Sequence, residues 1–527
     1  MISLNEWIQG LTFLKKALLA FLLGLMVAAA LPPVHLVFLL PVSFTGLILI
    51  LSGAKNRKQA FFVGWWFAWG QFIAGLYWIG VAFTIDADAH AALMPLPVLA
   101  LPAFLAIFPG LATLATHMTK VESVGRIFIF TSFWILSEYV RGTIFTGFPW
   151  NLVGYSWTFF LPVLQSTAYI GIYGLTLLTV LVSCLPALLA DRHIPKSTAI
   201  RFIATGGMVF ILIFVAGQWR LNEQTTDVYS EKKIRIIQPN IRQADKWKPH
   251  LRRNHLLKTI TLSQTENGFH PDYLIWPETA VPYFLTTSDQ LKAQLTEFVP
   301  QGGAIVTGAP RHNPETNQYW NSVHVLDGDG QIKQTYDKQH LVPYGEYLPL
   351  RNWLKATGLM KLIPVLDQMS DFAIPEAGAP KVISLSGLPP ARVMICYEIA
   401  FPWEVVPNTQ FSWILNATND GWFGNTSGPY QHLAITITRA VEHGKPVIRA
   451  ANTGISAIID PYGNIVQKLD LNETGIIDGY IPMPTETITF YGNVGEIVPA
   501  IMTLILFIIG VYYGRFRSRY KNTSFLD

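Results

Sequence analysis

Long apolar runs separated by short polar segments fill the first 219 residues, and one more run lies near the C-terminus. A helix that crosses a bilayer needs about 20 mostly apolar residues. The run at 126–140 is short and holds Glu138 near its end. The pattern predicts eight membrane-spanning helices, at residues 13–31, 34–52, 60–85, 92–118, 126–140, 165–190, 202–219 and 493–514.

A different pattern begins at residue 233, where short apolar, β-branched runs alternate with helical stretches near 246–267, 287–299 and 429–443. The apolar runs are too continuous for a sheet with one face in water, so both faces are expected to be covered. The class predicted is α/β with a layered sheet core. Turn sequences DGDG (327–330) and DPYG (460–463) indicate hairpins. The expected strands are 234–241, 272–278, 304–310, 322–327, 392–398, 412–418, 447–452 and 456–461.

Charge separates the same two regions. Only 14% of the 527 residues are charged, against roughly 25% in average soluble domains. Residues 1–219 hold 17 of the 72 charged residues and the other 308 residues hold 55. The predicted domains are a transmembrane domain (1–219), a globular domain (220–490), an eighth helix (491–514) and a basic tail (515–527). A net charge of +4 is too small and dispersed to predict nucleic-acid binding.

Lysine and arginine in short loops orient a membrane protein, because they stay on the cytoplasmic side. With a cytoplasmic N-terminus, the inside segments carry fourteen Lys and Arg residues, and the short outside loops carry only Arg141. The globular domain lies between the seventh and eighth predicted helices, so it is expected to face outward. In a bacterium this is the periplasm, with both termini in the cytoplasm.

The chain has two cysteines, Cys184 inside the sixth predicted helix and Cys396 alone in the globular domain. They cannot pair with each other across the membrane. An unpaired cysteine in an oxidising compartment indicates a reactive thiol. A small buried apolar side chain is the alternative, and the cysteine count leaves both open.

Three polar residues stand at or just beyond the ends of predicted structural units. Glu278 closes LIWPE, Lys338 lies in YDKQHLVPYGEY and Cys396 lies in MICYE. Acyl transfer needs a thiolate nucleophile, a carboxylate that takes and returns its proton, and a cation near the developing oxyanion. These residues supply the three roles, although each one singly could be a solvated or ion-paired surface group.

The order WPE, DKxHLVPYGEY, ICYE and NDGWFG resembles the nitrilase, or carbon–nitrogen hydrolase, superfamily. The apolar helices and TGFPWNLVGYS (146–156) resemble its membrane-bound branch, the bacterial apolipoprotein N-acyltransferases. The resemblance covers essentially the whole chain. It implies an α/β nitrilase-like αββα sandwich inserted in a polytopic α-helical membrane domain.

By this resemblance, Glu278 is the general base, Lys338 the transition-state stabiliser and Cys396 the nucleophile. Glu346 is expected beside Lys338, where it would keep the lysine charged. Tyr397 and Glu398 are two of the other supporting residues. They either shape the loop around the thiolate or take a direct part in the chemistry, and both possibilities stay open. The remaining positions that match functional residues of the family are Trp247 and Asn321.

The implied reaction moves an acyl chain from a phospholipid donor to the N-terminal amino group of a diacylated apolipoprotein through a thioester on the enzyme. It would complete bacterial lipoprotein maturation in the inner membrane, with the protein acting as a monomer. The main alternative is a membrane-tethered periplasmic amidase or nitrilase, since the same triad serves both. A degenerate domain acting as a receptor is a third class, disfavoured by the intact Glu278, Lys338 and Cys396.

Other signals have weaker meanings. The apolar stretch 347–373 is predicted to form a lid over the site, with an ordinary packed helix as the alternative. The aromatic loop 142–160 is expected to anchor at the membrane interface. The segment DADAH (86–90) has ligand-like spacing without a supporting cluster, so no metal is expected. The chain contains no glycine-rich phosphate loop or dinucleotide motif, and no cofactor is expected.

Overall fold

The structure, a computed structural model, describes residues 4–85, 94–192, 194–224, 227–358, 360, 371–405 and 410–523. Its internal contacts divide the chain into two units. The helical unit comprises Met1–Gln224, Thr426–Gly444 and Thr487–Asp527. The sandwich unit comprises Thr225–Asn425 and Lys445–Glu486.

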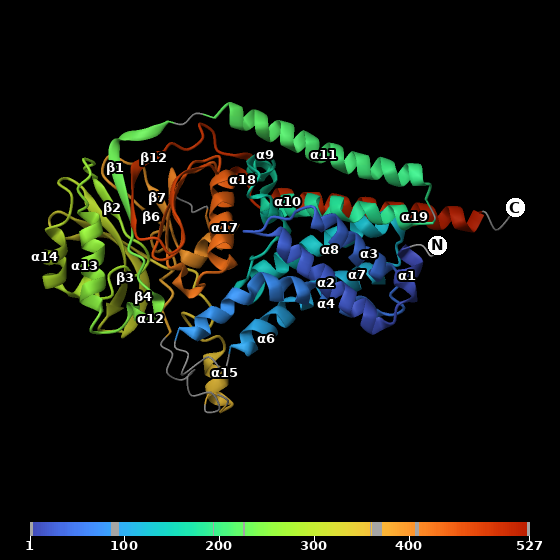
Figure 1. The fold of residues 1–527 in the computed structure, drawn as a ribbon, viewed down its shortest axis with the longest axis horizontal. Helices are drawn as coiled ribbons and strands as arrows, with labels where there is room; N and C mark the ends of the chain where they lie inside the picture. Colours follow the sequence, from blue (N-terminus) through green and yellow to red (C-terminus); the bar gives the residue numbers. More distant parts are fainter. Residues whose placement is uncertain are drawn as a thin grey trace. The chain divides into compact units, whose positions relative to one another are not determined.

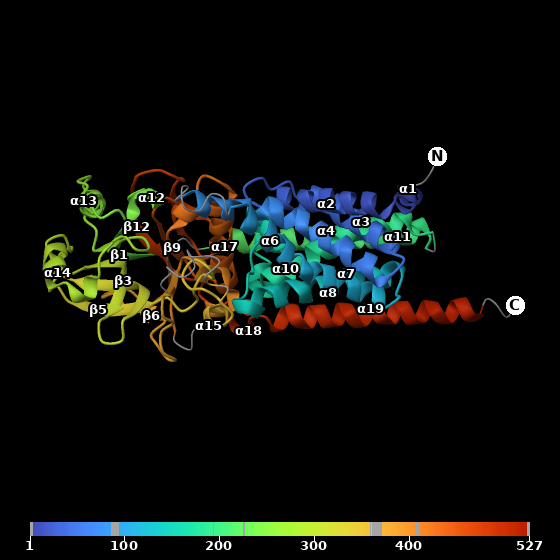
Figure 2. The same cartoon turned by 90° about the horizontal axis from the view of Figure 1, so that it is seen from below.

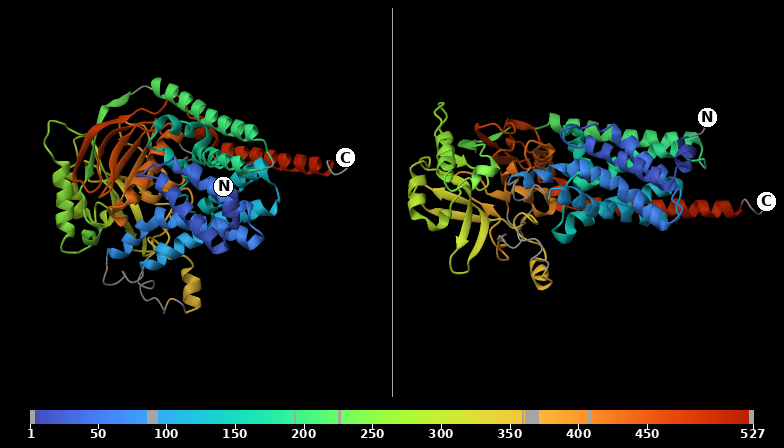
Figure 3. Two further views of the ribbon diagram at one scale, coloured as in Figure 1. Left: turned by 45° about the vertical axis from the view of Figure 1, so that its right-hand side comes forward. Right: turned by 60° about the horizontal axis from the view of Figure 1, so that its bottom comes forward.

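The helical unit consists of apolar helices packed side by side, with α2 against α4 and α19 along α8 (Figure 2). Helix α11 is little buried and lies at the edge of this unit (Figure 3). The longer helices are α2 (Phe13–Ala30), α3 (Leu39–Ser52), α4 (Arg57–Leu76), α6 (Pro95–Leu105), α7 (Ile107–Met118), α8 (Ser123–Thr143), α10 (Thr167–Cys184), α11 (Lys196–Asn222), α17 (Ser427–His443) and α19 (Ile497–Thr523).

Six helical segments among the described residues are long and apolar enough to cross a membrane. They correspond to six of the eight predicted spans. The other two predictions are not confirmed: the helix within 34–52 has only 14 residues, and the helix over 126–140 carries the buried ion pair between Glu138 and Arg141. The six segments are Phe13–Ala30, Arg57–Thr84, Pro95–Met118, Thr167–Ala190, Lys196–Asn222 and Ile497–Gly514.

The sandwich unit contains two mixed sheets of six strands each among the described residues. In each sheet three neighbouring strands run parallel, β1–β2–β3 in one and β7–β8–β9 in the other. In sheet order, the first has β12 (Gly475–Pro482), β1 (Val228–Gln238), β2 (Tyr273–Ile275), β3 (Ala304–Asn313), β4 (Gln318–Asp327) and β5 (Ile332–Asp337). The second has β11 (Ile465–Leu469), β10 (Ser456–Ile459), β9 (Val447–Ala451), β8 (Trp413–Thr418), β7 (Ala391–Ile395) and β6 (Val382–Ile383).

Both faces of the central strands of the first sheet are buried, which explains their continuous apolar runs. Successive side chains of a strand point to opposite faces. Ile236 and Ile275 therefore join Val393 of the second sheet in a core between the sheets. Ile237 and Leu274 face the other way, toward helices α13 (Arg252–Ser263) and α14 (Asp289–Thr296), which cover the outer face (Figure 1).

Each of the eight predicted strands overlaps an observed one, and the two predicted turns join β4 to β5 and β10 to β11. Four strands were not predicted: β5, β6, β11 and β12. Strands β5 and β11 are polar and partly exposed, so they lack the apolar run on which the prediction depends. Strand β6 has only two residues.

Helix α17 connects the parallel strands β8 and β9 along the chain, yet its contacts place it in the helical unit. Its Gln431 accepts the indole N–H groups of Trp78 and Trp150, at 3.0 and 2.8 Å. Its Glu442 accepts the backbone N–H of Ile172 at 2.7 Å, where α10 is interrupted by Gly171. Polar side chains of one connecting helix therefore bind the apolar bundle.

The predicted lid and the ligand-like segment fall partly or wholly outside the described residues. The proposed lid contains α15 (Arg351–Ala356), but residues 359 and 361–370 are outside. The ligand-like segment 86–90 is outside entirely. The lid therefore stays a prediction.

Candidate active site

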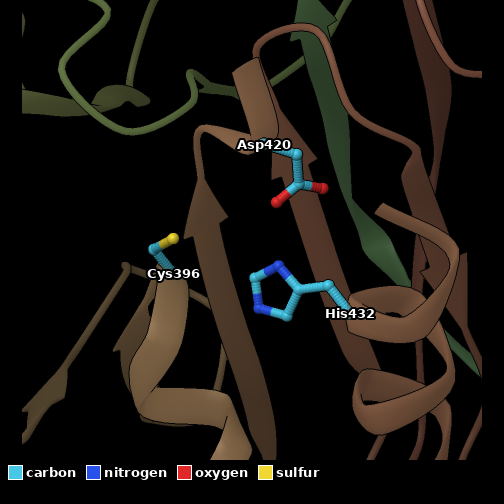
Figure 4. A group of neighbouring side chains, drawn as sticks. All are labelled: Cys396, Asp420 and His432. Atoms are coloured by element: carbon cyan, nitrogen blue, oxygen red, sulfur yellow. The ribbon is translucent and has the colours of Figure 1, made fainter. Parts of the chain in front are cut away.

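The three predicted triad residues follow three strands of the sandwich unit, and all are buried. Glu278 comes soon after β2, Lys338 directly after β5 and Cys396 directly after β7. Lys338 Nζ lies 3.9 Å from Glu278 Oε1. Cys396 Sγ lies within 4.8 Å of a carboxylate oxygen of Asp420, which follows β8 (Figure 4). Strand ends from two sheets thus supply the candidate site.

Asn321 and Glu346 hold the first two of these residues in place. The Asn321 amide, on β4, donates to Glu278 Oε1 at 2.7 Å and to Glu346 Oε1 at 3.0 Å. Lys338 Nζ donates to the same Glu346 oxygen at 2.8 Å. The other Glu346 oxygen accepts the backbone N–H of Val342 at 2.8 Å. Each carboxylate therefore has a fixed orientation toward the lysine.

These contacts set the charge state of the lysine. Burial alone would lower the pKa of Lys338, but the carboxylates of Glu346 and Glu278 outweigh it and raise the pKa above its usual value. Burial raises the pKa of Glu278, and the charge of Lys338 opposes this rise. The lysine therefore keeps its proton, while Glu278 accepts a proton more readily than an exposed glutamate does.

Cys396 has an unusual backbone conformation, with φ at +50° at the start of the short helix η8 (Cys396–Ala400). A residue with a Cβ rarely adopts this region, and such strain gathers at functional sites. Burial and the charge of Glu278 raise the pKa of the Cys396 thiol to about 12, while Lys338 opposes the rise. The resting sulfur is therefore a thiol.

Glu398 ties the end of β5 to the end of β7. Its carboxylate accepts the Tyr336 hydroxyl at 2.9 Å, the backbone N–H of Gln339 at 2.7 Å and that of Ile395 at 2.6 Å. The ring of Tyr397 packs edge-on against Phe401. These contacts hold the segment after Lys338 next to the segment of Cys396, which is a structural role for Glu398.

Trp247 lies further out than the other predicted residues. Its side chain is 40% exposed, and the Arg252 guanidinium lies 5.9 Å from its ring centroid. The preceding residue, Lys246, was not predicted as a site residue. Its Nζ is buried and donates to the backbone carbonyl of Glu278 at 3.1 Å. The alternation of charged and aromatic residues in ADKWKP is typical of a surface segment, so only its contacts reveal this lysine.

Asp420 was also missed, although it lies in the NDGWFG motif. Its carboxylate pairs with Arg449 at 2.6 Å and accepts the Thr418 hydroxyl at 3.1 Å. The charge of Asp420 is one of the influences that raise the pKa of Cys396. A buried acid with a matching arginine 29 residues away leaves no local pattern in the sequence.

The two mixed sheets form a carbon–nitrogen hydrolase-like domain, here in one chain with a unit of long apolar helices. The family model described as carbon–nitrogen hydrolase matches residues 233–487. The model described as the apolipoprotein N-acyltransferase N-terminal domain matches residues 23–185.

Similarity to curated relatives extends over nearly the full length. An apolipoprotein N-acyltransferase of Rhodopseudomonas palustris is 38% identical, with 94% of each chain covered. Another, of Brucella melitensis biotype 1, is 37% identical, covering 96% of this chain and 95% of that one. This chain belongs to the apolipoprotein N-acyltransferase family, and the resemblance seen in its motifs is confirmed.

Solved structures of the superfamily also align with the chain. A CN-hydrolase superfamily protein of Xanthomonas campestris is 17% identical, with a TM-score of 0.34, and 47% of this chain and 90% of that one are covered. Nit3 of Saccharomyces cerevisiae, a member of branch 10 of the nitrilase superfamily, is 16% identical, with a TM-score of 0.35, and the coverage is 50% and 94%.

Proposed function

We propose that this protein transfers a fatty acyl chain from a membrane phospholipid to the N-terminal α-amino group of S-diacylglyceryl-cysteine in apolipoproteins. This would be the final step of bacterial lipoprotein maturation, carried out by a monomer without a cofactor. The observation that carries the proposal is the similarity, over nearly the full length, to relatives named apolipoprotein N-acyltransferase. The buried cluster of Glu278, Lys338 and Cys396 supports the chemistry.

The first half of the reaction forms an acyl-enzyme. Glu278 takes the proton of the Cys396 thiol, and the sulfur attacks the ester carbonyl of the phospholipid. Lys338, which Glu346 holds charged, stabilises the oxyanion of the tetrahedral intermediate. The bond to the lysophospholipid oxygen breaks, Glu278 returns the proton to that oxygen, and a thioester remains on Cys396.

The second half transfers the acyl chain. The neutral amino group of the apolipoprotein attacks the thioester carbonyl, and Glu278 takes the proton that the nitrogen loses on forming the amide. The carbon–sulfur bond breaks, and the Cys396 thiolate recovers the proton from Glu278. One carboxyl group acts alternately as base and acid, a role suited to a buried group whose pKa is raised.

The supporting residues have separate roles in this proposal. Asn321 and Glu346 position Glu278 and Lys338 through the hydrogen bonds described above. Glu398 and Tyr397 shape the loop around the sulfur. Trp247, with its partly exposed ring, contacts the incoming lipid substrates.

The proposed setting is the bacterial inner membrane. We propose eight spans, with the domain boundaries and the periplasmic orientation that the sequence predicts: a transmembrane domain over 1–219, the catalytic domain over 220–490, a last helix over 491–514 and a cytoplasmic tail over 515–527. The six long apolar helices support membrane insertion. Substrates anchored in the same bilayer would reach the site at high local concentration, which favours transfer over hydrolysis.

The test is the intact mass of the purified full-length protein after incubation with phospholipid. We expect an added acyl mass on the peptide that contains Cys396, no adduct in Cys396→Ala, and an unchanged adduct in Cys184→Ala, which removes the other cysteine. Addition of an S-diacylglyceryl-cysteine peptide should then yield an amide. Release of free acid or ammonia without amide would instead favour the amidase alternative.

A further inference from the structure

A second buried lysine belongs to the candidate site. Lys246 ends the short helix α12 (Gln243–Lys246), and its side chain is only 3% exposed. Its Nζ donates to the backbone carbonyl of Glu278 at 3.1 Å. Lysine is rarely buried to this degree unless its charge is compensated, so this placement calls for a reason beyond packing.

The segment that carries Lys246 is fixed to the second sheet. Gln243 accepts the side-chain N–H of Asn419 at 2.7 Å, and Asn419 in turn accepts the amide of Asn452 at 3.0 Å. Asn452 also exchanges hydrogen bonds with both backbone groups of Ile241, at 3.0 and 2.8 Å. These side chains hold the start of α12, so the ammonium group is held beside the Glu278 turn.

The electrostatic partners of Lys246 are the reacting groups. Burial lowers its pKa to about 8, and the charges of Glu278 and Cys396 act in the opposite direction. Burial lowers the pKa of His255 on α13, and the charge of Lys246 also lowers it. Because electrostatic coupling is reciprocal, an ammonium group that a thiolate stabilises also stabilises that thiolate.

Lys338 also favours the Cys396 thiolate, since its charge opposes the rise in the pKa of that thiol. The charge of Lys338 is, however, shared with Glu346 at 2.8 Å and with Glu278 at 3.9 Å. Lys246 Nζ donates to a neutral carbonyl, so this hydrogen bond does not neutralise the charge of its ammonium group.

We propose that Lys246 is a positioning residue for the acyl transfer: its ammonium group holds the Glu278 turn through the backbone carbonyl, and its positive charge stabilises the Cys396 thiolate that forms when Glu278 accepts the thiol proton. This inference rests on the proposed function, because it assigns Cys396 the role of nucleophile.

The test measures alkylation of Cys396 by iodoacetamide in the full-length protein in detergent, with Cys184→Ala as background, from about pH 6 to about pH 10. The variants are Lys246→Met, Lys246→Arg and, as a matched control, Lys248→Met. Lys248 lies two residues away, is half exposed and pairs with Asp245 at 2.7 Å. Thermal unfolding of each variant reports its folding.

We expect Lys246→Met to slow alkylation about tenfold at neutral pH, because loss of the charge raises the pKa of the thiol by about one unit. Lys248→Met should match the background protein. In Lys246→Arg, Cys396 should be alkylated at the background rate at neutral pH. Above about pH 8 its alkylation should be faster than in the background protein, because a guanidinium keeps the charge that the lysine loses there.

A background-like pH profile in Lys246→Met would overturn the inference, as would an arginine variant that behaves like the methionine variant. If the methionine variant does not fold, the arginine profile above about pH 8 decides. Alkylation needs neither phospholipid nor acceptor. Failure of acyl transfer with the expected alkylation shifts would therefore reject the proposed function and leave this electrostatic role in place.

Discussion

The hydroxyl of Tyr336 lies 2.9 Å from both carboxylate oxygens of Glu398. Tyr336 belongs to β5 of the first sheet, and Glu398 follows β7 of the second. Lys338, the proposed stabiliser, comes two residues after Tyr336 in the chain. Cys396, the proposed nucleophile, comes two residues before Glu398. This one contact therefore joins the two sheets at the point where the proposed chemistry takes place.

Replacement of Glu398 by glutamine tests this connection. The two carboxylate oxygens of Glu398 accept hydrogen bonds from Tyr336 and from several backbone N–H groups. A glutamine has only one acceptor oxygen, so buried donors lose their partner. We expect a loss of about 2–4 kcal/mol in the free energy of unfolding. Thermal denaturation in detergent measures it. The control is Glu404→Gln, since Glu404 is partly exposed and binds His340; equal losses in both variants would contradict the structural role of Glu398.

Replacement of Glu278 by glutamine removes the proposed base. The rate of acyl-enzyme formation should fall about 10³-fold, while the fold is kept because the amide can still bind Asn321. In the wild type the ionised carboxylate is the active form. The rate should therefore decline as the pH falls through the pKa of Glu278, which burial raises. Stopped-flow or quenched-flow mass analysis measures this rate, and replacement of the exposed Glu297 by glutamine is the control. A wild-type rate that does not depend on pH would count against Glu278 as the base.

Replacement of Glu346 by glutamine tests how Lys338 keeps its charge. Burial lowers the pKa of this lysine, and Glu346 is the first of the groups that raise it. Without that carboxylate the pKa of Lys338 falls, so the cation is lost as the pH rises. We expect acyl-enzyme formation in the variant to decline on the alkaline side, where the wild type does not. A variant with a uniform loss at every pH would show that Glu346 acts only through geometry.

The break in α10 gives a prediction for the helical unit. Gly171 has φ at +63°, and a Cβ there would lie 2.3 Å from the ring of Tyr491. We expect Gly171→Ala to destabilise the protein by about 2–4 kcal/mol. Gly207 on α11 has open space around it, so Gly207→Ala should be neutral or slightly stabilising. Unfolding midpoints of the two variants in detergent give the comparison, and an unchanged midpoint for Gly171→Ala would contradict the need for glycine.

Local patterns were sufficient for much of the fold. The apolar runs predicted six of the long helices. Continuous β-branched runs predicted the buried strands of both sheets, which other parts of the chain cover on both faces. The predicted spans at 34–52 and 126–140 are not among these six helices: the first helix has only 14 residues, and the second carries the buried Glu138–Arg141 pair. The apolar pattern missed β5, whose residues are polar because the strand is partly exposed.

By itself the sequence determined the two regions, the positions of Glu278, Lys338 and Cys396 near strand ends, and the family. The tertiary structure decided which other groups meet them: Asn321 between two glutamates, Lys246 against the Glu278 carbonyl, and α17 within the helical unit. The physical reason is range. Hydrophobic periodicity and turn sequences act between near neighbours, whereas burial and hydrogen bonding join side chains that lie tens to hundreds of residues apart and set their charge only when the sheets have formed.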